Sequence, residues 1–337
     1  MSSPSDLGEF ELIRRFFIRD EKSRRESGVI LGIGDDAALL DLPKGTDLVA
    51  AVDTIVAGRH FPEDADARSV GHRALAVNLS DIAAMGATPL WATLALTMPS
   101  VDPDWLTRFA AGFLDLADAH AVALVGGDTT RGPLSISVQI LGHVPHGAAL
   151  RRSGAQAGDL LAVSGTLGDA AAGLAMLKAS ARRAGSSCEV DELIRRFEYA
   201  EPRVRLGLSA RGIASAAMDL SDGLVGDLPK LALASGLAAR VSVDLLPLSA
   251  AMKAAVNPNQ ALDWALAGGD DYELLFAVHP ERFAELKAAA DRLNLMLTTI
   301  GELSVGASVT WSRNGKEFVP SVSGFDHFAQ ASTQITV

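Results

Sequence analysis

The chain has 337 residues, 48% of them hydrophobic, and a formal net charge of −11 at pH 7. This length predicts about two domains, and the apolar content suffices for packed cores and excludes a disordered chain. An acidic balance argues against non-specific nucleic-acid binding, which requires a footprint of lysine and arginine. The single cysteine, Cys188, excludes an intrachain disulfide framework and a cysteine-based zinc site.

The N-terminal segment has acidic residues early and lacks the apolar core of a signal peptide. The uncharged stretch 82–101 is long enough to raise the question of a membrane span, but it contains Gly86, Pro89 and Pro99. A buried helix, turn and strand explain it better. We therefore expect a cytoplasmic protein without a membrane segment.

Apolar periodicity in the first part of the chain predicts alternating helices and strands. The expected helices are 7–19, 67–85 and 103–120. The expected strands are 29–33, 48–56, 90–97, 121–125 and 134–144. Asp53 interrupts a strand that otherwise reads as buried, which indicates a bulge, an edge position or a functional residue. Asp81 falls near the C-terminal end of a helix, where negative charge opposes the helix dipole, and this placement favours a function.

A shift in composition over 145–158, rich in Gly, Arg and Pro, predicts the boundary between an N-terminal domain, 1–145, and a C-terminal domain, 146–337. The expected strands of the second domain are 159–164, 216–220, 241–245, 272–278, 297–300, 308–313 and 316–319. Its expected helices are 169–178, two patches within 192–210, 224–235, 262–267 and 280–293. This alternation predicts an α/β protein.

Aspartates recur beside glycines or at the ends of these strands. They are Asp35 and Asp36 in GIGDD, Asp128 in GGDTTRG, Asp219 and Asp222 in MDLSDG, and Asp270 and Asp271 in GGDDYE. Adjacent carboxylates between apolar segments need a counter-charge or a solvated loop. The Gly-Gly pair before Asp128 follows an expected strand and would let backbone approach a ligand closely.

Structural explanations remain open for several of these positions. A lone histidine such as His60 is more often a surface residue than a ligand. Either Ser221 or Asp222 would serve as the N-cap of the helix 224–235. The glycine-rich turn 165–169 lacks a Walker A pattern and fits a tight strand-to-helix turn better than a phosphate site.

The donor set favours one metal. The chain has seven histidines, none spaced as HxH or HExxH, and aspartates are the carboxylate-rich, all-oxygen donors that Mg²⁺ prefers. Paired carboxylates also hydrolyse glycosides, but glycine-rich turns with Thr and Arg favour phosphoryl chemistry. From the residues alone we predict a Mg²⁺-dependent enzyme that handles phosphates.

Six ordered motifs closely resemble those of the thiamine-monophosphate kinase family. They are GIGDDAALL, VDTIVAGRHF, ALAVNLSDIAAMGATP, LVGGDTTRG, MDLSDGL and GGDDYELLF, and the likeness extends from GEFELIRRFF at 8–17 to GFDHF at 324–328. The resemblance implies two α/β (α+β) domains of the aminoimidazole ribonucleotide synthetase-like fold. The N-terminal one would bind ATP and Mg²⁺, the C-terminal one would complete the active site, and the N-terminal sheets of a homodimer would pair into a barrel.

The reaction that the resemblance implies is transfer of the ATP γ-phosphoryl group to thiamine monophosphate, giving thiamine diphosphate and ADP, in thiamine diphosphate biosynthesis. The implied metal ligands, for several Mg²⁺ ions, are Asp36, the carbonyl of Val52, Asp53, Asp81, Asp128, Asp219 and Asp222. The implied ATP contacts are Gly127, Asp128, Arg152 and Ser221, and the implied thiamine phosphate contacts are His60, Asp270 and Phe325. Catalysis would rest on Asp36, Asp81, Asp128 and Arg152, whereas Asp35 has no assigned chemistry.

Three positions depart from the family pattern. Ala51 stands where relatives can have a metal-contacting Ser, Asp270 where they often have Glu, and Phe325 where they often have Tyr or Trp. The alternatives are another ATP-dependent synthetase of the same superfamily and a non-catalytic nucleotide or thiamine-phosphate binding protein. The lone Cys188 lies in a polar segment and argues against the thiol-dependent synthetases. Retention of six aspartates argues against a binding protein.

Overall fold

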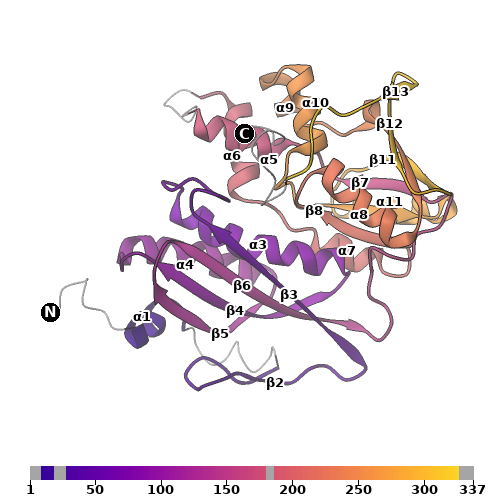
Figure 1. The fold of residues 1–337 in the computed structure, drawn as a ribbon. Coiled ribbons are helices and arrows are strands. Elements are labelled where there is room, and N and C mark those ends of the chain that lie inside the picture. Colours follow the sequence, from indigo (N-terminus) through magenta and orange to yellow (C-terminus); the bar gives the residue numbers. More distant parts are fainter. Residues whose placement is uncertain (1–8, 19–27, 180–185, 326–337) are drawn as a thin grey trace. The chain divides into compact units, whose positions relative to one another are not determined.

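The computed structural model describes residues 9–18, 28–179 and 186–325. The chain forms two compact units, one of residues 1–82 and 87–147 and the other of 83–86 and 148–337 (Figure 1). Each unit has its own mixed sheet and helices, so the predicted two-domain α/β architecture is confirmed. The first two residues and the last residue of the expected helix 7–19, and residues 326–328 of the GFDHF motif, lie outside the described residues.

The first unit is built on a four-stranded sheet with the order β3-β6-β4-β5. Its strands are β3 Thr46–Val56, β6 Ser135–Pro145, β4 Thr88–Met98 and β5 Ala123–Arg131. Only β4 and β5 run parallel, because helix α4, Pro103–Ala119, connects them. Strand β6 alternates buried residues with more exposed ones, so one face of the sheet forms the core and the other faces out.

Helices α3, Ala67–Ala84, and α4 lie along one face of this sheet (Figure 1). Two glycines let them cross closely, because a Cβ on Gly71 would lie 2.0 Å from the carbonyl oxygen of Phe109, and one on Gly112 would lie 1.9 Å from that of Arg68. Helix α1, Glu9–Phe16, packs on α4, and β1, Val29–Leu31, pairs with β2, Leu39–Leu40.

Two expectations for this sheet were wrong. The stretch 48–56 is not buried: β3 is an edge strand of alternating exposure, and the edge explanation for Asp53 is confirmed. The strand expected at 121–125 continues to Arg131, so Gly127 and Asp128 lie inside β5 instead of in a loop. Gly127 is needed there for packing on β4, because a Cβ would lie 1.9 Å from the oxygen of Leu94.

The second unit contains a seven-stranded sheet with the order β13-β12-β9-β11-β7-β10-β8. Its strands are β7 Leu160–Ser164, β8 Ala216–Leu220, β9 Ala238–Ser242, β10 Glu273–Val278, β11 Leu297–Ser304, β12 Val309–Arg313 and β13 Lys316–Phe318. Its helices are α5 Asp169–Lys178, α6 Cys188–Glu198, α7 Val204–Ala210, α8 Leu224–Ser235, α9 Ala250–Ala255, α10 Pro258–Ala267 and α11 Pro280–Arg292. Strands β7, β8 and β10 are the most buried; β8 ends just before Ser221 and Asp222, and β10 begins just after the GGDD segment.

The expected strand 241–245 was partly wrong, because β9 ends at Ser242 and a 3-10 turn, Val243–Leu245, follows. Helix α9 and strand β2 were not predicted. Helix α9 has only six residues, and its one sequence signal is the cap Ser249, whose hydroxyl accepts the N–H of Met252. The stretch 82–101 is the end of α3, a turn and β4, as expected. No helix among the described residues is long and apolar enough to cross a membrane.

Candidate functional site

The turn between β8 and α8 gathers predicted site residues from three parts of the second unit. Asp219 is buried in β8, and Ser221 and Asp222 follow it directly. The N–H of Asp270 donates to the carbonyl oxygen of Ser221 at 2.9 Å, and the N–H of Phe325 donates to that of Asp222 at 3.1 Å. Five residues from the predicted metal, ATP and thiamine phosphate sets therefore meet around one turn.

A buried carboxylate that the sequence analysis did not single out shapes this turn. Asp227, in the first turn of α8, is 1% exposed, and its Oδ2 accepts the N–H groups of Ser221 and Asp222 at 3.0 and 2.9 Å. Gly223 precedes the helix with φ +84° and no capping side chain, so neither Ser221 nor Asp222 is the N-cap. Burial raises the pKa of Asp227, and Lys230 acts against this shift.

Lys230 is the cationic partner of the turn. Its Nζ lies 2.6 Å from Oδ2 of Asp222 and 2.9 Å from Oδ1 of Asp227. Burial lowers the pKa of Lys230, but the two carboxylates more than offset this and raise it. The negative charge of Asp222 thus already attracts a cation in this structure.

The GGDD loop, residues 268–271, crosses the end of β8. The N–H of Tyr272 donates to the oxygen of Leu220 at 2.9 Å, and the Tyr272 hydroxyl donates to Oδ1 of Asp270 at 3.1 Å. Asp271 points the other way, and its carboxylate accepts the N–H groups of Gly168 at 2.7 Å and Ala170 at 3.3 Å. The turn 165–169 is a tight strand-to-helix turn, as expected, and its helix N-terminus holds the chain's own carboxylate.

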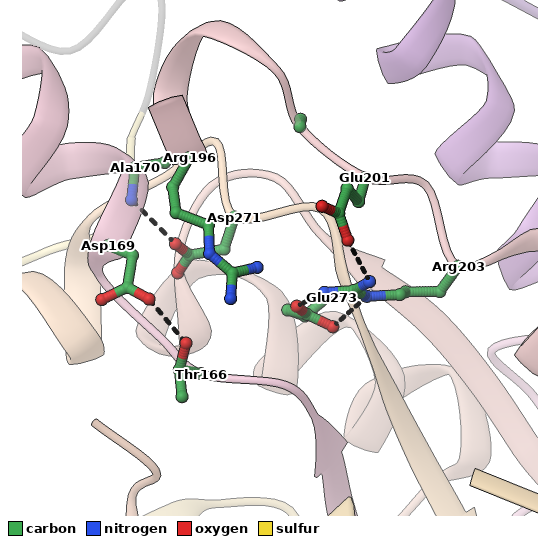
Figure 2. Close-up of a pocket in the computed structure, with 9 residues that line it drawn as sticks. Thr166, Asp169, Ala170, Arg196, Glu201, Arg203, Asp271 and Glu273 are labelled. Atoms are coloured by element: carbon green, nitrogen blue, oxygen red, sulfur yellow. Dashed lines mark hydrogen bonds and ion pairs between the residues drawn. The ribbon is translucent and has the colours of Figure 1, made fainter. Parts of the chain in front are cut away.

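Behind this loop lies a small pocket in the second unit, drawn in Figure 2. Its polar lining is Thr166, Asp169, Arg196, Glu201, Arg203, Asp271 and Glu273. Arg196 lies beside Asp271, and Arg203 lies beside Glu201 and Glu273 (Figure 2). Asp169 accepts hydroxyl hydrogens from Thr166 at 2.6 Å and Ser249 at 2.7 Å, while loss of solvation raises its pKa.

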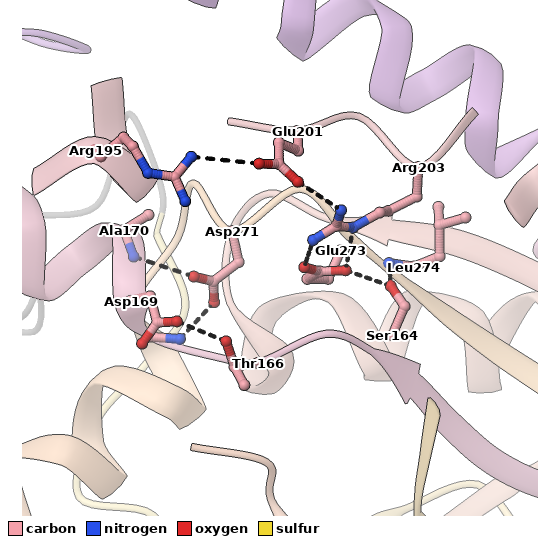
Figure 3. A network of polar contacts seen from close by, with 11 residues as sticks. Ser164, Thr166, Asp169, Ala170, Arg195, Glu201, Arg203, Asp271, Glu273 and Leu274 are labelled. Carbon is pink, nitrogen blue, oxygen red and sulfur yellow. Dashed lines mark hydrogen bonds and ion pairs between the residues drawn. The ribbon is translucent and has the colours of Figure 1, made fainter. Parts of the chain in front are cut away.

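The centre of this pocket is a buried ion pair (Figure 3). Arg203 and Glu273 have side chains 7% and 3% exposed, and they meet through Nε–Oε2 at 2.8 Å and through Nη2–Oε1. Ser164 donates to Glu273, and Glu201 accepts from Arg203 at 3.2 Å. Burial alone would lower the pKa of Arg203, but its carboxylate partners raise it. Because the charges of Arg203, Glu201 and Glu273 satisfy one another, we interpret this part of the pocket as a structural network.

In the first unit, α3 supports the edge strand β3. The side-chain oxygen of Asn78 accepts the N–H of Asp53 at 3.1 Å, and Asp81 lies one turn further along the same face of α3. The structure therefore brings Asp53 and Asp81 to the same region. His60 closes the turn after β3, where its Nδ1 accepts the N–H of Val56 at 3.0 Å. A neutral ring in this arrangement carries its hydrogen on Nε2.

Asp53 and Asp128 are not brought together within the described sheet. Asp53 is in register with Val138 and Leu94, whereas Asp128 is in register with Ala95, in the next row. Adjacent rows point to opposite faces, and three strand spacings separate β3 from β5 by about 14 Å. Val52 lies on the outer face, where its side chain is 62% exposed.

The remaining predicted residues are exposed. Asp36 lies between β1 and β2, and the adjacent Asp35 accepts its N–H at 2.8 Å, which gives Asp35 a role in holding the backbone of Asp36. Arg152 is exposed, and its carbonyl accepts the hydroxyl of Ser235 at 3.0 Å. Among the described residues, no three His, Cys, Asp or Glu side chains converge as a metal site.

Comparisons with known proteins indicate the same family as the sequence motifs. Residues 34–144 match the family "AIR synthase related protein, N-terminal domain", and residues 156–312 match its C-terminal domain. The chain is 47% identical over 323 residues to thiamine-monophosphate kinase of Escherichia coli K12, covering 96% of this chain and 98% of the relative.

Solved structures agree. The crystal structure of thiamine-monophosphate kinase from Stenotrophomonas maltophilia K279a superposes with a TM-score of 0.84 at 45% identity, covering 92% of this chain and 98% of that one. The complex of AaThiL with AMPPCP and TMP has a TM-score of 0.75 at 33% identity, covering 96% and 98%. The chain belongs to the thiamine-monophosphate kinase family, within the AIR synthase related proteins.

Proposed function

We propose that this protein is a thiamine-monophosphate kinase, which transfers the γ-phosphoryl group of ATP to thiamine monophosphate and yields thiamine diphosphate and ADP. The observation that carries the proposal is 47% identity to a kinase of that name over nearly the whole of both chains. A relative whose structure holds AMPPCP and TMP together supports ATP as co-substrate.

The acceptor in this reaction is a phosphate monoester, whose second pKa of about 6 leaves it an oxyanion near neutral pH. Attack on the γ-phosphorus therefore requires no general base from the protein. The main obstacle is repulsion between two polyanions, and catalysis consists of positioning them and stabilising their charge. Arg152, exposed and cationic, is proposed to add fixed positive charge on the ATP side.

We propose that Mg²⁺ ions serve this site. The donors fit the metal by chemistry, since they are exposed or half-exposed carboxylates and one carbonyl, apart from the buried Asp219. The proposed ligands are Asp36, the carbonyl of Val52, Asp53, Asp81, Asp128, Asp219 and Asp222. When bound, Mg²⁺ supplies charge neutralisation between the triphosphate of ATP and the phosphate of thiamine monophosphate.

The remaining proposed contacts are those with ATP and those with thiamine phosphate. Gly127, Asp128, Arg152 and Ser221 are proposed to hold ATP, and Ser221 lies just before the N-terminus of α8, a position that favours phosphate. His60, Asp270 and Phe325 are proposed to hold thiamine phosphate. The position of Asp270 and Phe325 on the Ser221–Asp222 turn supports this assignment.

We also propose a homodimer in which the N-terminal sheets form a shared barrel. The outer face of that sheet exposes Leu48 and Val52 by 54% and 62%, and β3 and β5 are its edges among the described strands. Pairing with a second copy of the chain would cover the exposed apolar residues and the strand edges. Light scattering should give twice the chain mass of 35.2 kDa, and a monomer would contradict the proposal.

The decisive test of function is direct. The purified protein is incubated with ATP, Mg²⁺ and thiamine monophosphate, and thiamine diphosphate and ADP are quantified by chromatography. Equal amounts of the two products support the kinase. ADP without thiamine diphosphate would favour another ATP-dependent synthetase, and binding of ATP with neither product would favour a binding protein.

A further inference from the structure

Asp271 is adjacent to Asp270, a proposed thiamine phosphate contact, but is not itself among the proposed site residues. We propose that Asp271 is a positioning residue, which fixes the GGDD loop on the N-terminus of α5 and so sets Asp270 against the Ser221–Asp222 turn. The inference rests on the proposed function, in which Asp270 holds thiamine phosphate.

The first support is the anchor itself. The first N–H groups of a helix have no partner within the helix, and Gly168, which precedes α5 with φ +85°, offers no capping side chain. The carboxylate of Asp271 takes the N–H groups of Gly168 and Ala170 at 2.7 and 3.3 Å. Burial raises the pKa of Asp271, and these hydrogen bonds at the start of the helix act against that shift. Asp271 thus caps α5 from a loop about 100 residues away in sequence.

The second support is the backbone on either side of Asp271. Asp270 and Tyr272 have φ of +72° and +50°, a region that residues other than glycine adopt at a cost. Their N–H groups donate to the oxygens of Ser221 and Leu220, both at 2.9 Å. Such a backbone persists only when its surroundings hold it, and the hydrogen bonds of three consecutive residues do so here.

The third support is the close packing of the same segments. A Cβ on Gly269 would lie 2.4 Å from the oxygen of Ser221, and one on Gly168 would lie 2.7 Å from the backbone of Trp264 and Ala265. The loop therefore touches the Ser221 turn through backbone, and the start of α5 touches the end of α10 in the same way. A change at Asp271 has no flexible side chain to absorb it, so we expect it to shift Asp270.

A helix cap without a positioning role would give a different result. Its loss would lower stability and would not distinguish between the two substrates. Loss of a positioning residue should weaken the contact that Asp270 makes and spare ATP, because a displacement of about 1 Å at a reacting site can cost roughly 100-fold.

The test uses Asp271→Asn in the full chain, with one substrate varied while the other is saturating. The amide keeps the size of the side chain, but one carboxylate oxygen becomes an NH₂ group. This donor would face a backbone N–H, which is also a donor. We expect the KM for thiamine monophosphate to rise about tenfold or more, with the KM for ATP within about twofold of wild type. If Asp271→Asn does not fold, Asp271→Glu keeps the charge and displaces the loop, and the same selective rise is expected.

The matched control is Asp159→Asn. Asp159 lies in the second unit, is 1% exposed, and like Asp271 accepts a backbone N–H, in this case from Gln156 at 2.9 Å. This variant should lower the melting temperature and leave both KM values unchanged.

A double variant shows whether Asp271 acts through Asp270. In an Asp270→Asn background, Asp271→Asn should not raise the KM for thiamine monophosphate further. Equal rises in both KM values, no rise, or full additivity with Asp270→Asn would overturn the inference alone. Failure of the wild type to form thiamine diphosphate would overturn the proposed function and this inference with it.

Discussion

The two units hold their acidic residues in different ways. In the first unit, Asp36 and Asp128 are exposed, and the sheet spreads Asp53 and Asp128 over opposite edges. In the second unit, the buried carboxylates of Asp227 and Glu273 and the half-buried carboxylate of Asp271 bind backbone N–H groups or an arginine, and Asp222 already has a lysine partner.

The comparison teaches that a recurring motif combines two kinds of carboxylate. In GGDD, Asp270 faces the turn and Asp271 the interior of the unit. In the SDG segment, Asp222 lies at the turn while Asp227, one helical turn later, holds it. Asp222 and Asp270, at the turn, are suited to ligands, whereas Asp227 and Asp271 bind the backbone that presents them.

The largest expected effect is on activity, at an exposed carboxylate of the first unit. Asp128→Asn keeps the shape and removes the charge that we assign to Mg²⁺ and ATP, so turnover should fall by roughly 1,000-fold. Asp81→Asn should behave likewise. Circular dichroism and melting curves should match wild type. Near-wild-type turnover of both variants at saturating Mg²⁺ would contradict the metal cluster.

At a buried carboxylate of the second unit, we expect the main effect on stability instead of on activity. Glu273→Gln leaves the buried guanidinium of Arg203 with the more exposed Glu201 as its remaining charged partner, which should cost about 3 kcal/mol of unfolding free energy. Urea denaturation measures the loss, and the Arg203→Met, Glu273→Leu double variant should recover part of it. A loss below about 1 kcal/mol would show that the pair is not the centre of the network.

A smaller difference in activity is expected between variants of the adjacent residues Asp35 and Asp36. Asp36→Asn should lower turnover and raise the Mg²⁺ concentration for half-maximal rate, because Asp36 is the proposed ligand. Asp35→Asn retains an oxygen that can accept the N–H of Asp36, so it should cost less than about threefold. Equal losses in the two variants would remove the distinction.

The sequence predicted most of the fold because its periodicity is strong. The bounds of β8 and α8 were predicted to the residue, since a buried apolar run meets a glycine turn there. It could not predict that β5 continues through Gly127, because that depends on contact with Leu94 of a neighbouring strand. The roles of Asp227, Asp271 and Glu273 were also missed, since a carboxylate that accepts a distant N–H has no local signature.

The smallest expected effect concerns His120, a histidine of the first unit. Burial lowers the pKa of His120, beside His72, below its usual value of 6.5. The unfolded chain therefore binds a proton more readily, and this contribution to stability is complete above about pH 6.5 and is lost as the pH falls towards the lowered pKa. Loss of solvation raises the pKa values of Asp169, Asp227 and Asp271, which has the opposite effect on the pH dependence of stability, so the measurement compares wild type with His120→Gln. As the pH falls from 7.5 to 5.5, wild type should lose more unfolding free energy than His120→Gln, so that the difference between them shrinks or reverses in favour of the variant. A constant difference would show that the pKa of His120 does not change on folding.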